Sequence, residues 1–422
     1  MKVLFVNTSE RTGGAAVATG RIVQAVRAQG IEARLLVRDR ATDDPGVSAL
    51  KPSRKQKWYF LRERLGIWLH NRLSRKDLFA VSTATAGFDI TRHPDFQEAD
   101  LIHLHWINQG FLSLRTLYRI LHCGKPVVWT MHDMWPCTGI CHHARHCTAF
   151  HKECRGCFFL HHEGNGTDLS TRIFRRKRRC YDKAPLTFVG CSRWIADRAR
   201  ASALTEGHAV TDIPNPIDTT FFTPRDKAEA RAACGLPREG KLILFGSAKI
   251  TDERKGGGYL AEACRILVEK DSRLKESLGV VVFGQNSHAL ESLLPFRIYP
   301  MEYLHDMHRI ACLYSAVDLF VTPSLEENLP NMLMEAMACG TPCVGFHTGG
   351  IPEMIDHRTN GYVARYRSAE DLAAGIDYVL HAGNHDELSR NAVEKVRRTY
   401  SQEAVGQRYA ALYRSLIHTE NA

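Results

Sequence analysis

The sequence predicts an α/β protein made of two doubly wound, Rossmann-like domains. Its 422 residues exceed the size of one typical hydrophobic core, so two domains are expected. Short β-branched apolar runs alternate with helical patterns along the whole chain, which is typical of parallel α/β layers. Three prolines in residues 213–226, IPNPIDTTFFTPRD, interrupt this alternation and indicate a linker between the two domains.

The expected strands are short apolar runs on both sides of this linker. They are residues 2–8, 33–39, 100–106, 126–133, 185–192, 241–247, 277–284, 318–324 and 341–347, with helices such as 15–30, 111–121, 256–270 and 331–340 between them. The domains are expected at 1–213 and 214–398, followed by a terminal helix in 399–422. Ligands of such sheets bind beyond the carboxyl ends of the strands, so the residues after each strand are the candidates for a site.

Composition limits the class of protein. The start of the chain lacks the apolar region of a signal peptide, and no stretch of about 18 apolar residues could span a bilayer, so a cytoplasmic protein is expected. The 13 cysteines are then expected to be thiols or metal ligands instead of disulfides. A net charge of +10 favours anionic partners such as nucleotides or acidic lipid surfaces.

Two acids near residue 330 are candidates for contacts to a sugar. Glu327 follows the strand at 318–324, and Glu335 lies one turn into a helix that begins near Asn331. Carboxylates at such places can accept hydrogen bonds from the hydroxyls of a ribose or a hexose. Free N–H groups at the helix start can hold a phosphate. Alternatively, both are ordinary acids favoured near a helix N-terminus.

Other strand ends carry a glycine pair and a cation. Gly13 and Gly14 follow the first strand, where a missing Cβ allows the close approach of a ligand, although a plain turn explains them equally well. Lys255 follows a strand and a polar loop, where it could neutralise a phosphate or lie solvated at the surface.

Three histidines follow or lie on neighbouring strands of the first domain. His132 ends the strand at 126–133, where it faces a ligand or holds its own loop. His103 and His105 are two residues apart on one strand and therefore point to the same face, so structural roles are expected for them.

The insertion at residues 137–157 is rich in cysteine. Cys141, Cys147, Cys154 and Cys157 are spaced C-x5-C-x6-C-x2-C, which suits a tetrahedral, structural zinc site of four thiolates. Neighbouring histidines could replace a thiol in such a site. Unligated cysteines that pack the loop are the alternative.

The segment Lys51–Lys76 mixes aromatic and leucine side chains with many cations. Such segments lie in the interface of an anionic membrane, with the cations toward the headgroups. Packing of the aromatic residues against the first domain is the alternative.

The segment 324–355 resembles the retaining GT-B glycosyltransferases of family 4. Members commonly read P-S-x-x-E-x7-E-A-x-A-x-G-x-P-V-V, followed by Gly-Gly-x-x-E. The matching residues here are Pro323, Ser324, Glu327, Glu335, Ala336, Gly340, Pro342, Gly349, Gly350 and Glu353. IPNPID at 213–218 and GGAAVATGRI at 13–22 extend the resemblance over essentially the whole chain. It implies two domains that face each other across a cleft, with the last helix packing back on the first domain.

The resemblance also implies roles for single residues. Glu335 would bind the donor's ribose, Glu327 the transferred sugar and Lys255 the departing diphosphate, while His132 would lie near the reacting groups. The implied donor-binding residues are Gly13, Gly14, Arg254, Lys255, Glu327, Leu329, Pro330, Asn331, Met332 and Glu335. Many relatives carry an arginine where Ser247 stands, so Arg254 or Lys249 would supply the second phosphate contact.

The function implied is transfer of a sugar, as in hexosyltransferases, from a nucleotide-diphosphate sugar to a saccharide or lipid-linked saccharide. Retention of the anomeric configuration is expected. Members with an HDMWP-like segment and these four cysteines look like enzymes of bacterial extracellular polysaccharide synthesis, which would act at the inner face of the membrane. No D-x-D triplet is present, so no catalytic metal is expected.

Two other functions are weighed against this one. A zinc-containing basic protein that binds nucleic acid would leave the pair Glu327 and Glu335 unexplained, and no nucleic-acid-binding module is recognisable. A non-catalytic GT-B assembly partner is disfavoured because Glu335 and Lys255 are both present.

Overall fold

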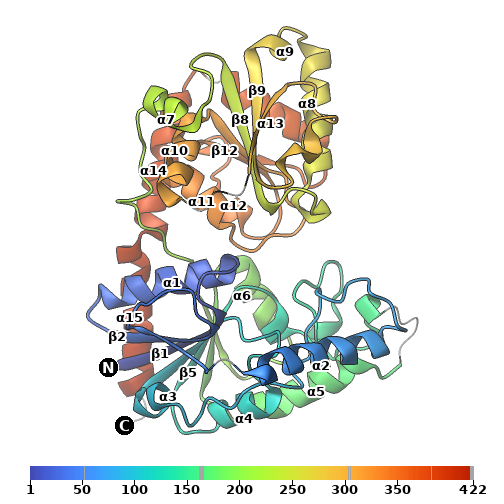
Figure 1. Ribbon diagram of the computed structural model, residues 1–422, viewed down its shortest axis with the longest axis vertical. Helices are drawn as coiled ribbons and strands as arrows, with labels where there is room; N and C mark the ends of the chain where they lie inside the picture. Colours follow the sequence, from blue (N-terminus) through green and yellow to red (C-terminus); the bar gives the residue numbers. More distant parts are fainter. Residues whose placement is uncertain (52, 161–165, 303, 305, 382, 419–422) are drawn as a thin grey trace. The chain divides into compact units, whose positions relative to one another are not determined.

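The chain forms two compact units, each with its own sheet (Figure 1). The computed structural model describes residues 1–418 except 52, 161–165, 303, 305 and 382. Unit 1 comprises Met1–Pro216 and Val405–Ala422, and unit 2 comprises Ile217–Ala404. The sequence placed the boundaries after residues 213 and 398, whereas the two units divide after Pro216 and, inside the last helix, after Ala404.

Unit 1 contains a seven-stranded parallel sheet in the order β3-β2-β1-β4-β5-β6-β7. Its strands are β1 (Lys2–Ser9), β2 (Glu32–Asp39), β3 (Val47–Ala49), β4 (Leu101–Leu104), β5 (Val127–Met131), β6 (Leu186–Gly190) and β7 (Ala209–Asp212). Its helices are α1 (Gly14–Arg27), α2 (Arg54–His70), α3 (Pro94–Glu98), α4 (Leu114–Leu121), α5 (Leu169–Tyr181) and α6 (Arg193–Arg200), with most of α15 (Gln402–His418).

Unit 2 contains a six-stranded parallel sheet in the order β10-β9-β8-β11-β12-β13. Its strands are β8 (Lys241–Lys249), β9 (Leu278–Gln285), β10 (Arg297–Met301), β11 (Leu319–Thr322), β12 (Cys343–Phe346) and β13 (Gly361–Ala364). Its helices are α7 (Lys227–Cys234), α8 (Gly257–Lys270), α9 (Leu274–Ser277), α10 (Met307–Ala316), α11 (Asn331–Ala338), α12 (Ile351–Met354), α13 (Ala369–His381) and α14 (His385–Tyr400).

Both faces of the unit 1 sheet are buried, which explains its continuous apolar strands. Alternate residues of a strand point to opposite faces. Val3 and Phe5 of β1 accordingly join one core cluster with α1 and α15, whereas Leu4 and Val6 join another with α4, α5 and α6. All five residues of β5 are buried. This burial on two faces is the pattern of parallel sheets covered by helices on each side.

The strand order reverses direction at one place in each sheet. In the first sheet, β2 and β3 lie on one side of β1, and the chain then crosses to β4 on the other side. In the second sheet, β9 and β10 lie on one side of β8, and the chain then crosses to β11 on the other side. The connections that leave the carboxyl ends of these strands diverge at this switch point and leave room for a ligand. The fold therefore directs attention to the segments after β1, β4, β8 and β11.

The last helix, α15, packs on the sheet of unit 1. Val405, Tyr409 and Tyr413 are fully buried in the cluster that contains Phe5. A Cβ at Gly406 would lie 2.5 Å from the carbonyl oxygen of Ala25, so the two helices approach closely at this glycine. Among the described helices, none combines the length and the apolar character that crossing a bilayer would need.

Candidate functional site

The switch point of unit 2 places a cation and a carboxylate in contact. Lys255 ends a short 3₁₀ turn after β8, and Glu327 lies in the loop after β11. The Lys255 Nζ atom donates a hydrogen bond to Glu327 Oε2 at 2.6 Å. The two side chains are 29% and 18% exposed, so the pair is accessible to a ligand but partly screened from water.

Two glycines hold the backbone on which this pair rests. Gly256, at φ 75°, would place a Cβ 1.9 Å from the carbonyl oxygen of Pro323, and Gly349, at φ 56°, would place one 1.6 Å from that of Glu327. Both positions therefore require glycine for conformation and for space. The Gly350 N–H also donates to the carbonyl of Asn328 at 2.7 Å. Gly349 and Gly350, which match the Gly-Gly-x-x-E motif of the sequence, thus support the loop that carries Glu327.

The N-terminus of α11 follows this loop directly. Pro330 is the N-cap residue of the helix, and its side chain makes no capping hydrogen bond. The first N–H groups of a helix lack partners within the helix and attract negative charge. Leu329 is buried, whereas Pro330, Asn331 and Met332 are half-buried. The sequence prediction of an anion-binding helix start at these residues is consistent with this geometry.

Glu335 lies inside α11 and is almost completely buried. It is 7% exposed and accepts a hydrogen bond from the Tyr314 hydroxyl of α10 at 2.9 Å. This tyrosine was not predicted from the sequence, because the two residues come from different helices. The hydroxyl fixes the orientation of the carboxylate.

The two cations predicted for the second phosphate contact have different surroundings. Arg254 forms a two-point ion pair with Asp252 at 2.7 and 3.2 Å, and this hydrogen bonding raises the pKa of the guanidinium. Lys249 is exposed at the end of β8. Ser247 is 4% exposed, and its hydroxyl has no hydrogen-bond partner in the described part of the chain.

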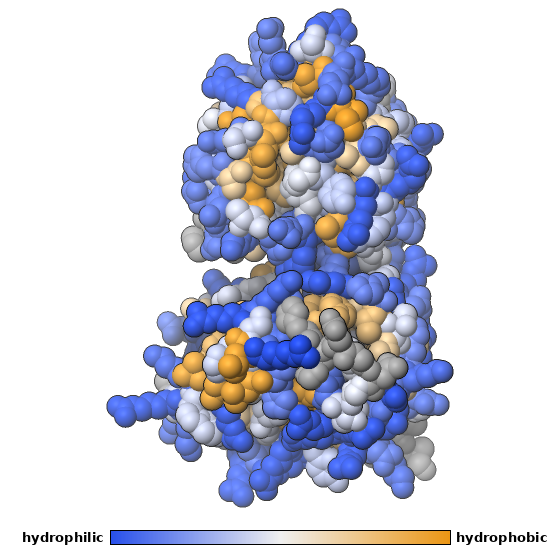
Figure 2. Space-filling view, turned by 90° about the vertical axis from the view of Figure 1, so that its right-hand side faces the viewer, coloured by the Kyte–Doolittle hydropathy of each residue, from blue (hydrophilic) through white to orange (hydrophobic). Residues whose placement is uncertain are grey.

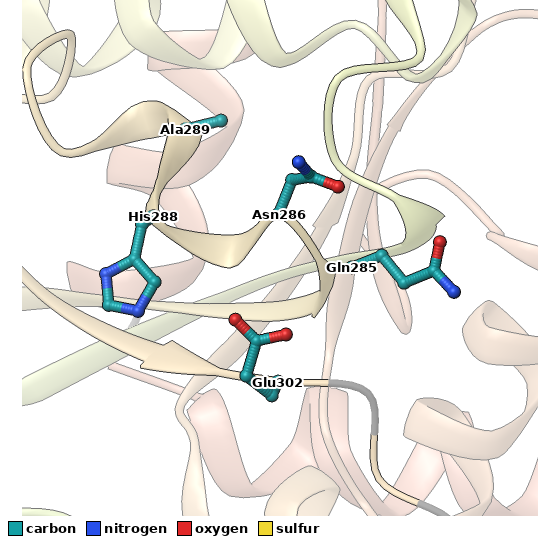
Figure 3. Close-up of a pocket in the computed structure, with 5 residues that line it drawn as sticks. All are labelled: Gln285, Asn286, His288, Ala289 and Glu302. Carbon is teal, nitrogen blue, oxygen red and sulfur yellow. The ribbon is translucent and has the colours of Figure 1, made fainter.

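A polar pocket opens at the next two strand ends of unit 2. It has a volume of about 650 Å³ and is lined by Gln285, Asn286, His288, Ala289 and Glu302 (Figure 3). Gln285 ends β9 and is the register partner of Lys249 on β8, so the pocket adjoins the segment that leads to Lys255. Sequence reasoning missed these residues, although each of Gln285, Asn286 and Glu302 stands at or just after the carboxyl end of a strand.

In unit 1, the loop after β1 leads into the N-terminus of α1. Gly13 precedes the helix with φ 91° and ψ 162°, a conformation open almost exclusively to glycine. Gly13, at the N-cap position, has no side chain to cap the helix, and the first turn contains no acid. Gly13 and Gly14 are exposed. The pair therefore leaves an accessible helix start at the switch point of unit 1.

His132 belongs to a buried chain of aromatic and hydroxyl groups. Its Nε2 lies 2.9 Å from Nδ1 of His105, and the two rings stack with centroids 5.2 Å apart. His103 lies 2.7 Å from both the Thr130 and the Tyr413 hydroxyls. The expectation of structural roles for His103 and His105 agrees with these contacts, which connect His132 to helix α15.

Asp133 serves its own loop. Its carboxylate accepts hydrogen bonds from the Trp106 indole at 2.8 Å and the Trp135 backbone N–H at 2.8 Å, and it lies 2.6 Å from His142 Nδ1. Burial alone would raise its pKa, but His142 and these hydrogen bonds outweigh burial and lower the pKa to about 2. These contacts give Asp133 a role in positioning the loop after β5.

The cysteines of the insertion pack into the core of unit 1. Cys141 and Cys154 are buried there, and Cys147 and Cys157 lie against the same cluster. Burial raises the pKa of the Cys141 thiol to about 11. In the part of the chain that the structure describes, no three His, Cys, Asp or Glu side chains are grouped to hold a metal ion. Zinc at the four cysteines stays a prediction and enters none of the proposals below.

Two models of known protein families match this chain. A family model described as "Glycosyltransferase Family 4" matches residues 12–221, and one described as "Glycosyl transferases group 1" matches residues 240–382. The chain belongs to the GT-B glycosyltransferases of family 4. Each model covers most of one unit, and the E-x7-E motif lies within the second.

Relatives of this glycosyltransferase include enzymes with different acceptors. The D-inositol 3-phosphate glycosyltransferase of Arthrobacter sp. is 25% identical over 96% of this chain and 90% of that protein. The N-acetyl-alpha-D-glucosaminyl L-malate synthase of Bacillus anthracis is 24% identical over 50% of this chain and 53% of that protein. A second inositol 3-phosphate enzyme, from Saccharomonospora viridis, is 31% identical over 45% of this chain and 46% of its own length. The chain thus matches about half the length of the latter two.

Solved structures share the fold over the full length. Sucrose-phosphate synthase of Thermosynechococcus elongatus has a TM-score of 0.68 at 17% identity, covering 99% of this chain and 100% of that one. Anabaena HepE in complex with UDP has a TM-score of 0.64 at 16% identity, covering 98% and 100%. These similarities establish two Rossmann-like domains of the GT-B class, as the sequence predicted.

The predicted site residues fall into two groups. Lys255, Glu327, Leu329–Met332 and Glu335 come together in unit 2 around the N-terminus of α11. Gly13, Gly14 and His132 lie in unit 1, after β1 and β5.

Replacement of Gly349 tests the support of the Glu327 loop. Gly349→Ala should lower the free energy of unfolding by about 2 kcal/mol or more, because a side chain at positive φ is strained and its Cβ meets the Glu327 carbonyl. Urea unfolding of the purified protein measures this change. Gly258→Ala in α8, where a Cβ would meet nothing within 4 Å, is the matched control. Equal stability of the two variants would contradict the account.

The stability of unit 1 should depend on the protonation of His132. Burial lowers its pKa to about 4 from 6.5, so the folded state favours the neutral ring. The resulting stability is complete above pH 6.5 and is lost as the pH falls from 6.5 toward 4. Protonation of His132 should therefore lower the free energy of unfolding by about 2 kcal/mol between pH 7 and pH 5.

Urea unfolding at both pH values compares the wild type with His132→Gln. The variant should lose less stability at pH 5 than the wild type does. His122→Gln, at an exposed histidine of the same unit, should leave the difference unchanged. An identical pH response in His132→Gln would show that this ring is not held neutral.

Proposed function

We propose that the protein transfers a sugar from a nucleotide-diphosphate sugar to a hydroxyl of a saccharide or lipid-linked saccharide. One observation carries the proposal: Lys255 and Glu327 meet beside the N-terminus of α11, at the switch point of the unit 2 sheet. A diphosphate needs cations and N–H donors, and a sugar needs carboxylate acceptors. These groups are the ones that the strand ends bring together.

Electrostatic stabilisation of the leaving group is the proposed main contribution of unit 2. Negative charge develops on the diphosphate as its bond to the sugar breaks. The Lys255 ammonium and the first N–H groups of α11 are fixed before the reaction, so they stabilise this charge without reorganisation. No step in this proposal requires a metal ion.

The rest of the donor would extend along the neighbouring strand ends. We propose that Glu335 binds the ribose hydroxyls through a carboxylate oriented by Tyr314. The pocket at Gln285 and Asn286 offers amide groups that can pair with the polar edge of a base (Figure 3). HepE, a protein of the same fold, was crystallised with UDP, which supports a nucleoside diphosphate as the ligand.

The transfer is proposed to retain the anomeric configuration. The acceptor oxygen forms a bond to the anomeric carbon on the face from which the diphosphate oxygen departs. The acceptor proton passes to that diphosphate oxygen, so no nucleophile of the protein is needed. Glu327 positions the sugar, and His132 is proposed to contact the transferred sugar or the acceptor hydroxyl in its neutral form, which its lowered pKa favours at neutral pH.

The acceptor is proposed to be a growing extracellular polysaccharide or its lipid-linked precursor, elongated at the cytoplasmic face of a membrane. The support is the resemblance of the segment from His132 to Cys157, with its HDMWP-like start and four cysteines, to members that look like enzymes of bacterial extracellular polysaccharide synthesis. The relatives named above use inositol 3-phosphate or L-malate as their names state, so the acceptor varies within the family.

Donor binding can be measured by thermal melting of the purified full-length chain. At least one of UDP-, GDP- and ADP-sugars should raise the melting temperature, because a ligand at 100 times its Kd stabilises the folded state by about 2.7 kcal/mol. Glu335→Gln should weaken that donor about tenfold or more, because a hydrogen bond to a charged group is lost. Failure of every nucleotide sugar to stabilise the protein would refute the proposal.

Two matched variants separate binding from folding. Tyr314→Phe removes the hydroxyl that contacts Glu335 but leaves the carboxylate, so donor affinity should change far less than in Glu335→Gln. Lys255→Met should slow transfer about a hundredfold. Lys275→Met, at an exposed lysine of α9, should not. Equal affinity losses in Tyr314→Phe and Glu335→Gln would reduce Glu335 to a structural residue.

A further inference from the structure

Helix α2 of unit 1 exposes a continuous stripe of large apolar side chains. Trp58, Leu61, Leu65 and Leu69 are each between 54% and 61% exposed. Residues three and four apart lie on the same side of a helix, so these four form one stripe. Glu63, Arg64 and Ile67 are the buried residues of the helix. Exposed apolar patches on otherwise polar surfaces mark sites of interaction.

The stripe continues into a groove beside the helix. The groove has a volume of about 740 Å³ and is lined by Trp58, Leu61, Arg62, Arg64, Leu65, Trp68, Arg75 and Leu78. Leu73 and Phe79, after the helix, are 56% and 66% exposed. Figure 2 shows hydrophobic side chains gathered in one patch on unit 1, bordered by hydrophilic ones.

Cations surround this patch without exposed acids among them. The exposed basic residues of the segment are Lys51, Arg54, Lys55, Lys57, Arg62, Arg72, Arg75 and Lys76. The one acid within residues 51–76, Glu63, is fully buried and pairs with Arg64 at 3.4 Å. The surface around the stripe is therefore positively charged, and it fits a partner that offers both negative charge and an apolar interior.

We propose that this face of α2, defined by the stripe Trp58–Leu61–Leu65–Leu69 and its flanking cations, docks onto the surface of an anionic phospholipid bilayer. The apolar stripe enters the boundary between headgroups and acyl chains, and the cations contact the phosphates. A second copy of the chain fits less well. A two-fold interface would bring two such cationic borders together with no exposed acid in the segment to pair them.

This inference is independent of the donor chemistry, since all of its residues lie between Lys51 and Phe79, in α2 and the segments next to it. Docking would hold unit 1 at the membrane, where a lipid-linked acceptor is found. The sugar transfer proposed above could fail its test while membrane docking held, and the reverse is equally true.

Vesicle co-sedimentation of the full-length protein tests the docking. The protein should sediment with vesicles of phosphatidylcholine mixed with phosphatidylglycerol at low salt. It should remain in the supernatant with phosphatidylcholine alone, and binding should fall as salt is added. Binding to both vesicle types alike, or to neither, would overturn the proposal.

Two sets of variants separate the apolar stripe from the charges. The triple variant Leu61→Ser, Leu65→Ser, Leu69→Ser should weaken partition about tenfold or more, through loss of apolar insertion. Its control is Leu293→Ser with Met307→Ser, which changes exposed apolar residues of unit 2. The double variant Arg72→Glu, Lys76→Glu should weaken partition to anionic vesicles about tenfold. Its control is Arg238→Glu, Lys275→Glu in unit 2.

Each set has a result that removes one part of the proposal. Unchanged partition in the leucine variant, with melting temperature preserved, would exclude insertion of the stripe. Light scattering, which measures the oligomeric state, tests the alternative that this face contacts a second copy of the chain. A dimer of the wild type that the leucine variant dissociates, without vesicle binding, would assign the face to a second copy of the chain.

Discussion

A salt bridge between Lys255 and Glu327 joins the two loops that leave the switch point of the unit 2 sheet. These loops approach each other because Gly256 has no Cβ to collide with the backbone of Pro323. Gly349, in the loop after β12, lets that third loop pack against the backbone of Glu327. The loop that carries Glu327 leads directly into the N-terminus of α11. Sheet topology, glycine geometry and the electrostatics of a helix end thus converge on one place, where a diphosphate and a sugar can be held together.

The two units use their strand ends differently. In unit 2 the polar groups are accessible, as in the pair Lys255–Glu327 and the pocket at Gln285. In unit 1 the polar groups after β4 and β5 are committed to one another. His132 contacts His105, and Asp133 holds Trp106 and His142. This division suits an enzyme whose donor needs charge stabilisation from unit 2, while unit 1 presents a fixed, neutral histidine and a charged outer face on α2.

Sequence alone predicted the central strands and the residues after them, because strands buried on both faces read as continuous apolar runs. The edge strands β3, β7, β10 and β13 were missed. In β7 and β10, most residues are only half-buried. Strand β10 also contains Pro300, which only an edge strand tolerates. Spacing located Glu335 on a helix but could not show Tyr314, which reaches it from α10. Spacing also could not show that the Asp133 carboxylate forms hydrogen bonds within its own loop.

Hydrogen exchange of the full-length protein with and without a nucleoside diphosphate tests the central claim most directly. The account predicts that the ligand slows exchange at the amides of residues 250–258 and 324–333, which contain the Lys255 turn, the Glu327 loop and the first turn of α11. Protection should be weaker in Lys255→Met. Protection elsewhere in the chain with none in these two segments would contradict the assignment of the donor site to the switch point of unit 2.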